Sequence, residues 1–252
     1  MRGRLSSGPR APVPCTRASV PTCPSPSDSS GASPSDMTAT SRAVSAEHFA
    51  YLSSRTAGDD EFLVDLKRAA AAADIPAIWI SPEQASLMQI LLRLHGAQEV
   101  VEVGTLAGYS AIAMARALPE AGRVRTIEVK GRHADFAEDW IGRSDVAGRI
   151  EVLRGRALDV LPGLAADSAD AVFIDADKES YVGYLAESLR IVRRGGLIMV
   201  DNAFAFGRLL EEDCTDPDVE AVRVFNDHMA GVHDLQSIIV PIGDGLWVGV
   251  KL

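Results

Sequence analysis

Acidic residues stand at or beside the ends of four short apolar runs, and they are Glu102, Glu128, Asp175 and Asp201. Asn202 follows the last of these acids directly. The oxygens of Asp175, Asp201 and Asn202 are hard ligands that suit an octahedral Mg²⁺ or Mn²⁺. Zinc is not expected there, because no Cys or His accompanies them. A single acid at a strand end can be explained by solubility as well as by a function, but four acids at comparable positions favour a shared site.

Lys178 is the candidate base, because it stands three residues after Asp175. Desolvation beside a metal would favour its neutral form, which could then take a proton from a substrate. The alternative is an ordinary solvated charge at a helix start. The five histidines are scattered along the chain, and we interpret all of them as structural or surface residues: His48, His95, His133, His228 and His233.

A glycine-bounded turn, Gly104 to Gly108, follows the first apolar run and leads into a helix predicted over 111–118. Such a turn lets a ligand approach the backbone and the free N–H groups of a helix start. The G-x-x-x-G spacing differs from the G-x-G-x-x-G of dinucleotide sites. Glu102 would repel a pyrophosphate but tolerate a cationic ligand that carries an amino acid. Glu128 follows Gly104 by 24 positions, which is typical of an acid that binds ribose hydroxyls.

The elements that must position these residues alternate regularly. Short apolar strands are predicted at 100–103, 124–128, 150–153, 171–175, 197–201, 236–242 and 246–251. Helices are predicted between the first five, with Arg194-Gly195-Gly196 capping the helix at 181–192. This alternation predicts an α/β, Rossmann-like, doubly wound sheet of seven mostly parallel strands. The Gly243-Asp244-Gly245 turn predicts a C-terminal antiparallel hairpin. Ligands of such sheets bind at the carboxyl ends of the strands.

The N-terminal region divides into two parts. Residues 1–36 hold seven of the 13 prolines and nine serines, which predicts a disordered tail. A true start at Met37 is equally compatible with the sequence. A single domain is then expected over 37–252, with a helical pattern at 46–73 and a capping box at Ser81–Gln84. These helices, at about 46–80, could form a lid or a dimer face, or simply cover the sheet.

The composition excludes several classes of protein. The chain of 252 residues is 47% hydrophobic and 24% charged, with a net charge of −10. An acidic chain of this kind is not expected to bind nucleic acid or an anionic membrane. Three cysteines without a C-x-x-C pattern form no disulfide framework, so a reducing cytoplasm is the default.

Three motifs together resemble the cation-dependent O-methyltransferases, the family of catechol and caffeoyl-CoA O-methyltransferases. They are E-V-G-T-L-A-G-Y-S at 102–110, F-I-D-A-D-K at 173–178 and R-G-G-L-I-M-V-D-N at 194–202. The resemblance runs from about Ser81 to Leu252, including P-I-G-D-G-L at 241–246, and it implies a class I methyltransferase fold and a homodimer. It implies S-adenosylmethionine (SAM) near Glu102, Gly104, Tyr109, Ser110, Glu128, Ala157 and Asp175. It further implies a divalent metal on Asp175, Asp201 and Asn202, Lys178 as base, and a small phenolic acceptor. The face of Tyr109 could then attract the sulfonium.

The chain departs from the family pattern at two places. Residues 203–207 stand where a V-L-W-x-G-type segment is common, so the resemblance leaves the acceptor open. Lys130 and Arg132 follow Glu128 where more acidic residues are expected. Two alternatives stay open: an NAD-dependent oxidoreductase on a similar sheet, disfavoured by the glycine spacing, and a non-catalytic SAM-binding protein. A nucleic-acid methyltransferase is disfavoured by the acidic charge and by D-A-D-K in place of an N-P-P-Y-type motif.

Overall fold

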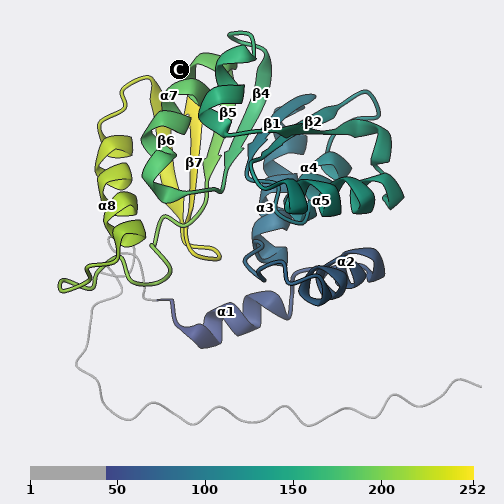
Figure 1. The fold of residues 1–252 in the computed structure, drawn as a ribbon. Coiled ribbons are helices and arrows are strands. Elements are labelled where there is room, and N and C mark those ends of the chain that lie inside the picture. The colour runs from purple at the N-terminus through teal and green to yellow at the C-terminus, as the bar shows by residue number, and fades with distance from the viewer. Residues whose placement is uncertain (1–43) are drawn as a thin grey trace, which may run out of the picture. The chain divides into compact units, whose positions relative to one another are not determined.

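Seven strands pair into one sheet within residues 44–252, the part of the chain that the structure, a computed structural model, describes (Figure 1). Their order is β3-β2-β1-β4-β5-β7-β6. The strands are β1 (Glu99–Val103), β2 (Arg123–Glu128), β3 (Ile150–Arg154), β4 (Ala169–Ile174), β5 (Val192–Val200), β6 (Leu235–Val240) and β7 (Leu246–Lys251). The first five run parallel, whereas β7 pairs antiparallel with both β5 and β6. The predicted doubly wound sheet with a C-terminal hairpin is therefore confirmed. The predicted tail of residues 1–36 and the alternative start at Met37 lie outside the described residues.

Different helices cover the two faces of the sheet. The α-helices of the described chain are α1 (Ala46–Ser53), α2 (Glu61–Ala72), α3 (Pro82–His95), α4 (Tyr109–Ala117), α5 (Gly131–Arg143), α6 (Ala157–Val160), α7 (Tyr181–Ile191) and α8 (Pro217–Ala230). Of these, α2 to α8 contribute to the two cores. Successive strand side chains point to opposite faces. Val100 and Phe173 accordingly pack in one core with residues of α2 to α5. Val101 and Val172 pack in the other core with residues of α6 to α8.

The predicted helical stretch at 46–73 is two helices. Asp60 begins α2, and its side chain accepts a hydrogen bond from the N–H of Leu63 (3.0 Å). A strong N-cap of this kind starts a new helix, so the helical stretch is interrupted between α1 and α2. α2 buries Leu63 and Leu66 in the core, whereas α1 buries no residue. α2 therefore covers the sheet, and a role as lid or dimer face stays a prediction for α1.

The predicted glycine cap of α7 is wrong. The helix ends at Ile191, and β5 begins at once with Val192. Gly195 and Gly196 lie inside β5, where the register with β4 shifts. A Cβ on Gly196 would stand 2.7 Å from the carbonyl oxygen of Asp170. These glycines therefore allow a bulged strand to pass close to its neighbour.

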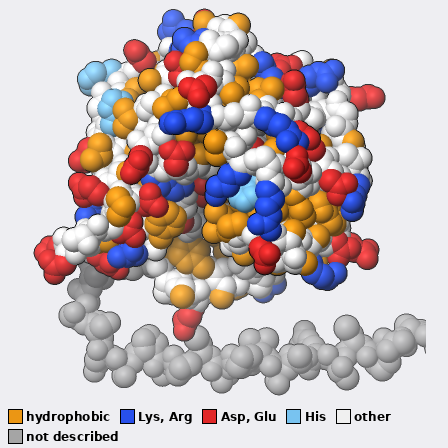
Figure 2. Space-filling model, in the orientation of Figure 1, with side chains coloured by type: hydrophobic (Ala, Val, Ile, Leu, Met, Phe, Trp, Pro, Cys, Tyr) orange, Lys and Arg blue, Asp and Glu red, His pale blue; other side chains and the backbone are white. Residues whose placement is uncertain are grey.

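The surface and the helices bear on possible partners. On the face in Figure 2, acidic and basic side chains are interspersed, with hydrophobic side chains between them. That face therefore presents no broad field of one sign. Among the described residues, no helix is long and apolar enough to cross a membrane.

Candidate active site

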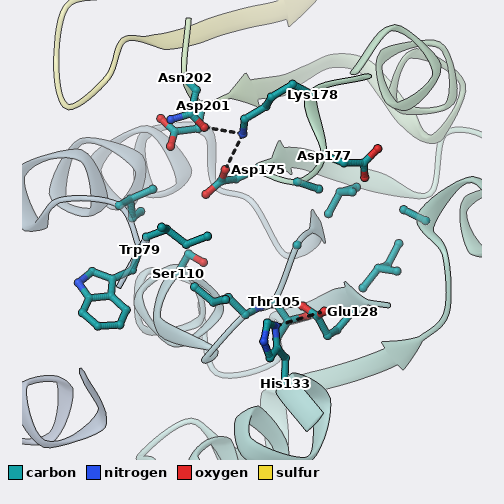
Figure 3. Close-up of a pocket in the computed structure, with 18 of the residues that line it drawn as sticks. Trp79, Thr105, Ser110, Glu128, His133, Asp175, Asp177, Lys178, Asp201 and Asn202 are labelled. Atoms are coloured by element: carbon teal, nitrogen blue, oxygen red, sulfur yellow. Dashed lines mark hydrogen bonds and ion pairs between the residues drawn. The ribbon is translucent and has the colours of Figure 1, made fainter. Parts of the chain in front are cut away.

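A cavity of about 1050 Å³ opens at the carboxyl ends of the strands, where the strand order reverses between β1 and β4. This is the position at which open α/β sheets bind ligands. Nine of the ten predicted site residues line the cavity: Gly104, Tyr109, Ser110, Glu128, Ala157, Asp175, Lys178, Asp201 and Asn202. Glu102 does not line it. Figure 3 shows two groups on opposite sides of the cavity, Lys178 with its partners and Glu128 with His133.

The turn after β1 requires glycine. Gly104 has a φ of +103°, and a Cβ there would stand 2.0 Å from the carbonyl oxygen of Asp175. Gly108, with a φ of +85°, is the N-cap of α4, so this helix begins at Tyr109, two residues before the predicted start. The turn thus brings backbone atoms of β1 and β4 together and leaves its own backbone open to a ligand.

Glu128 is held by backbone N–H groups. Its Oε2 accepts from the N–H of Leu106 and its Oε1 from the N–H of Lys130, both at 2.9 Å. Each carboxylate oxygen keeps a second lone pair, which could accept from a ribose hydroxyl. The Glu128 side chain is nevertheless buried, so it is fixed before any ligand binds.

His133 was interpreted, with the other histidines, as a structural or surface residue, and the structure shows that it is not on the surface. It is buried, lines the cavity, and its Nδ1 lies 3.7 Å from Oε1 of Glu128. Burial lowers the pKa of His133, which favours the neutral ring. Its place on the first turn of α5, five residues after the ribose-type acid, was the signal available in the sequence.

Glu102 lies behind the glycine turn and is fully buried. Neither carboxylate oxygen has a hydrogen-bond partner among the described residues. Burial raises the pKa of Glu102 to about 8, although the hydroxyls of Ser110 and Thr126 favour its ionised form. A cationic group bound beside Ser110 would favour the ionised form of Glu102. Direct contact between Glu102 and a ligand stays a prediction.

Tyr109 faces a cation of the protein itself. Its hydroxyl donates to Oδ1 of Asp59 (2.7 Å), and Nζ of Lys67 lies 3.9 Å from its ring centroid. Lys67 also binds Oδ2 of Asp59 (2.6 Å). These contacts tie the start of α4 to α2. The ring thus already has a cation–π partner, and a further role beside a sulfonium stays a prediction.

Lys178 connects the predicted metal ligands. It is buried, at the start of the short helix η4 (Lys178–Ser180), just after β4. Its Nζ donates to Oδ1 of Asn202 (2.6 Å), to the hydroxyl of Tyr181 (2.6 Å) and to Oδ1 of Asp175 (3.2 Å) (Figure 3). The structure therefore brings Asp175, Lys178 and Asn202 together from the ends of two neighbouring strands.

Asp201 is held by a residue that the sequence analysis assigned to another task. Nε2 of Gln84, on α3, donates to Oδ1 of Asp201 (2.7 Å). Burial and then the neighbouring Asp175 raise the pKa of Asp201 to about 7. The predicted capping box is only half present: Ser81 accepts from the N–H of Gln84 (3.2 Å), but the Gln84 side chain turns to Asp201. A hydrogen bond from the Gln84 amide to a buried carboxylate is stronger than the contact with the helix start that the capping box would give.

The donor set at this end of the cavity fits a hard divalent cation. Two carboxylates and an amide oxygen, from Asp175, Asp201 and Asn202, converge where the carboxylates repel each other. A cation among them would relieve that repulsion. Residues 44–252 contain no cluster of three or more His, Cys, Asp or Glu that could hold a metal. A site here would therefore depend on the Asn202 amide as its third protein ligand.

Comparison with known families decides what kind of protein this is. A model of the O-methyltransferase family matches residues 53–252. The chain belongs to the O-methyltransferase family. Membership decides against the NAD-dependent oxidoreductase, which the glycine spacing had already disfavoured.

Relatives of known name or structure agree with the family. This O-methyltransferase is 40% identical to a catechol O-methyltransferase of Niastella koreensis, over 80% of this chain and 90% of the relative. An O-methyltransferase from Bacillus cereus, solved in complex with SAH, is 33% identical, with a TM-score of 0.74 over 81% of this chain and 96% of the other. TomG from Streptomyces achromogenes, solved with SAM, is 34% identical, with a TM-score of 0.72 over the same shares.

Proposed function

We propose that this chain transfers the methyl group of SAM to a hydroxyl of a small phenol, most simply a catechol, and that Asp175, Asp201 and Asn202 hold a Mg²⁺ or Mn²⁺ for that reaction. The observation that carries the proposal is the set of contacts of Lys178. Its Nζ lies within hydrogen-bond distance of two of the three metal-ligand candidates, Asp175 and Asn202. A base and hard oxygen ligands thus stand side by side at the cavity wall.

The two sides of the cavity suit the two substrates. The Gly104 turn, Ser110 and Glu128 offer backbone approach, a hydroxyl and a fixed carboxylate for the amino-acid and ribose parts of SAM. SAM would supply an electrophilic methyl group, and the divalent cation would lower the pKa of the acceptor hydroxyl. Holding acceptor and methyl donor in one cavity supplies much of the rate of a direct displacement.

Lys178 has the part of proton acceptor. Its Nζ, in the neutral form, can take the proton of the acceptor hydroxyl. The hydroxyl of Tyr181 and Oδ1 of Asn202 keep Nζ at this place, because both lie 2.6 Å from it. A base held in this way is preorganised for proton transfer.

Aromatic residues at the cavity support a planar acceptor. Trp79 precedes α3 and Phe206 follows β5, and both line the cavity. The Phe206 side chain is half-exposed, which leaves its ring free to cover a substrate. The sequence at 203–207 departs from the family pattern, so the identity of the phenol is not carried over from the relatives.

The test is turnover with a paired panel of acceptors. The protein would be incubated with SAM and with vicinal diols, each matched by the monophenol of the same skeleton, with and without EDTA. We expect methylated diol, loss of product with EDTA, and recovery when Mg²⁺ is added in excess. Equal turnover with and without EDTA would contradict the proposed metal dependence. SAM binding without turnover on any diol or monophenol would instead favour the non-catalytic SAM-binding protein.

A further inference from the structure

We propose that Asp244, in the turn between β6 and β7, is a positioning residue that orients the Asn202 amide toward the metal site and holds Phe206 at the acceptor mouth. The inference rests on the proposed function, because the proposed function makes Asn202 a metal ligand. It gives a task to Asp244, which the sequence analysis named only within the Gly243-Asp244-Gly245 turn.

One carboxylate makes three contacts on the segment that follows β5. Oδ2 of Asp244 accepts from Nδ2 of Asn202 (3.1 Å) and from the N–H of Phe206 (2.7 Å). Oδ1 accepts from the N–H of Gly207 (3.0 Å). The backbone adds to this, because the carbonyl oxygen of Asp244 accepts from the N–H of Phe204 (2.9 Å). The turn and the loop are therefore joined by side chain and backbone together.

Donor and acceptor chemistry fixes which way the Asn202 amide faces. A carboxylate can only accept, so the Asp244 side needs the NH₂ group of the amide. Lys178 can only donate, so the other side needs the amide oxygen, which lies 2.6 Å from Nζ. A flipped amide would set two acceptors face to face on one side and two donors on the other. Asp244 and Lys178 together therefore present Oδ1 of Asn202 to the site.

The same carboxylate holds a strained loop. Asn202, Ala205 and Phe206 all have positive φ, at 62°, 52° and 61°. Non-glycine residues keep this conformation only where the surroundings enforce it. Two of the three side-chain contacts of Asp244 go to the N–H groups of Phe206 and Gly207. Loss of Asp244 would therefore release both the metal ligand and the aromatic wall of the acceptor site.

The glycines beside Asp244 let the turn reach the site. A Cβ on Gly243 would stand 2.3 Å from Oε1 of Gln84, and one on Gly245 would stand 2.9 Å from Cγ of Phe204. Gln84 in turn binds Asp201. The turn consequently contacts Gln84, which holds Asp201, and itself supplies Asp244, which holds Asn202. This explains why an acid between two glycines occupies this position.

The experiment measures metal affinity apart from turnover. Mn²⁺ binding would be followed by its EPR signal in the full chain saturated with SAH, without acceptor, for the parent, D244A and D244N. Loss of an outer-shell partner typically weakens metal binding 10- to 100-fold. We expect such a rise in the Mn²⁺ dissociation constant for D244A. We expect a smaller rise for D244N, whose single oxygen can still accept from Asn202 and Phe206. The acceptor KM should rise in parallel, and the SAH dissociation constant should stay within about twofold.

A matched control separates positioning from stability. Asp170 also accepts from two backbone N–H groups, those of Gln98 (2.7 Å) and Glu99 (2.9 Å), but at the amino ends of the strands. D170A should lower the melting temperature without changing Mn²⁺ affinity. Unchanged Mn²⁺ affinity in D244A would overturn the inference alone, as would equal losses of Mn²⁺ and SAH binding in both Asp244 variants. A parent chain that binds no Mn²⁺ would overturn the proposed metal site and this inference together.

Discussion

The two ends of the cavity are built in different ways. At the cofactor end, Glu128 is held by backbone N–H groups of Leu106 and Lys130, and the Gly104 turn offers its own backbone. At the end of the proposed metal site, called the metal end below, side chains hold side chains across long separations in sequence. Gln84 reaches Asp201 over 117 positions, and Asp244 reaches Asn202 over 42.

This difference indicates how each end responds to substitution. A backbone-built end depends on the conformations that glycine allows, so an added Cβ should damage it most. A side-chain-built end depends on paired donors and acceptors, so loss of one partner should leave the other unsatisfied. Substitutions at one end should therefore leave the other end largely intact.

Lys178→Met should have the largest effect. Removing Nζ removes the proposed proton acceptor, and general base catalysis typically contributes 10²- to 10⁴-fold, so kcat should fall by about that factor. Mn²⁺ affinity should not weaken, because the oxygens of Asp175 and Asn202 lose a competing cation. SAH formation under single-turnover conditions measures the first effect. Lys251→Met, which removes only a contact with Asp167 and a backbone carbonyl, is the control. A variant with more than a tenth of parental kcat would contradict the role.

Gly104→Ala should break the cofactor end. The new Cβ would stand 2.0 Å from the carbonyl oxygen of Asp175, in a residue with a φ of +103°. Relief of that clash must shift the turn, so we expect SAH affinity to fall about 10- to 100-fold, equivalent to about 1.4 to 2.8 kcal/mol. Isothermal titration with SAH measures it. Gly131→Ala, with open space around its Cβ and no positive φ, should bind SAH normally. Parental SAH affinity in Gly104→Ala would show that the turn tolerates a side chain.

Gln84→Leu should weaken the metal end alone. The substitution leaves Oδ1 of buried Asp201 without its 2.7 Å donor. Loss of such an outer-shell partner should reduce Mn²⁺ affinity about tenfold, with SAH affinity unchanged. The same EPR titration measures both. Gln89→Leu is the control, because Gln89 lies on α3 like Gln84 but donates to the carbonyl oxygen of Ala113 on α4. A matching loss in both variants would mean that α3 packing, and not the Asp201 contact, supports the metal.

The same contrast explains what the sequence could predict. The strands, the glycine turn and the acids at the strand ends follow from local patterns, and the family resemblance added Tyr109, Ser110 and Ala157. The fold was therefore predicted, and nine of the ten predicted site residues line the cavity. The supporting roles of Gln84 and Asp244 could not be predicted, because their partners are distant in sequence and no local pattern indicates the pairing. Gln84 even fitted a capping box, and His133 looked like any helix histidine. The break between α1 and α2 was visible only as a capping aspartate, Asp60.

Glu102 belongs to neither end, because its carboxylate oxygens have no hydrogen-bond partner within residues 44–252. Its pKa is raised to about 8 in the fold and is about 4.5 in the unfolded chain. The folded state therefore retains a proton that the unfolded state releases. The stabilisation is full below pH 4.5 and is lost as the pH rises toward 8, at up to about 1.4 kcal/mol per pH unit.

Glu102→Gln should remove this pH dependence, because the amide stays neutral throughout. In the ligand-free protein, the melting temperature of the variant should gain on that of the parent by several degrees between pH 5.5 and pH 8.5. Glu151→Gln, at an exposed position of β3, should follow the parent at both values. If Glu102→Gln also follows the parent, the buried carboxylate is already ionised. At neutral pH, Glu102 would then be a fixed negative charge beneath the cofactor turn and would act on a ligand there through its electric field.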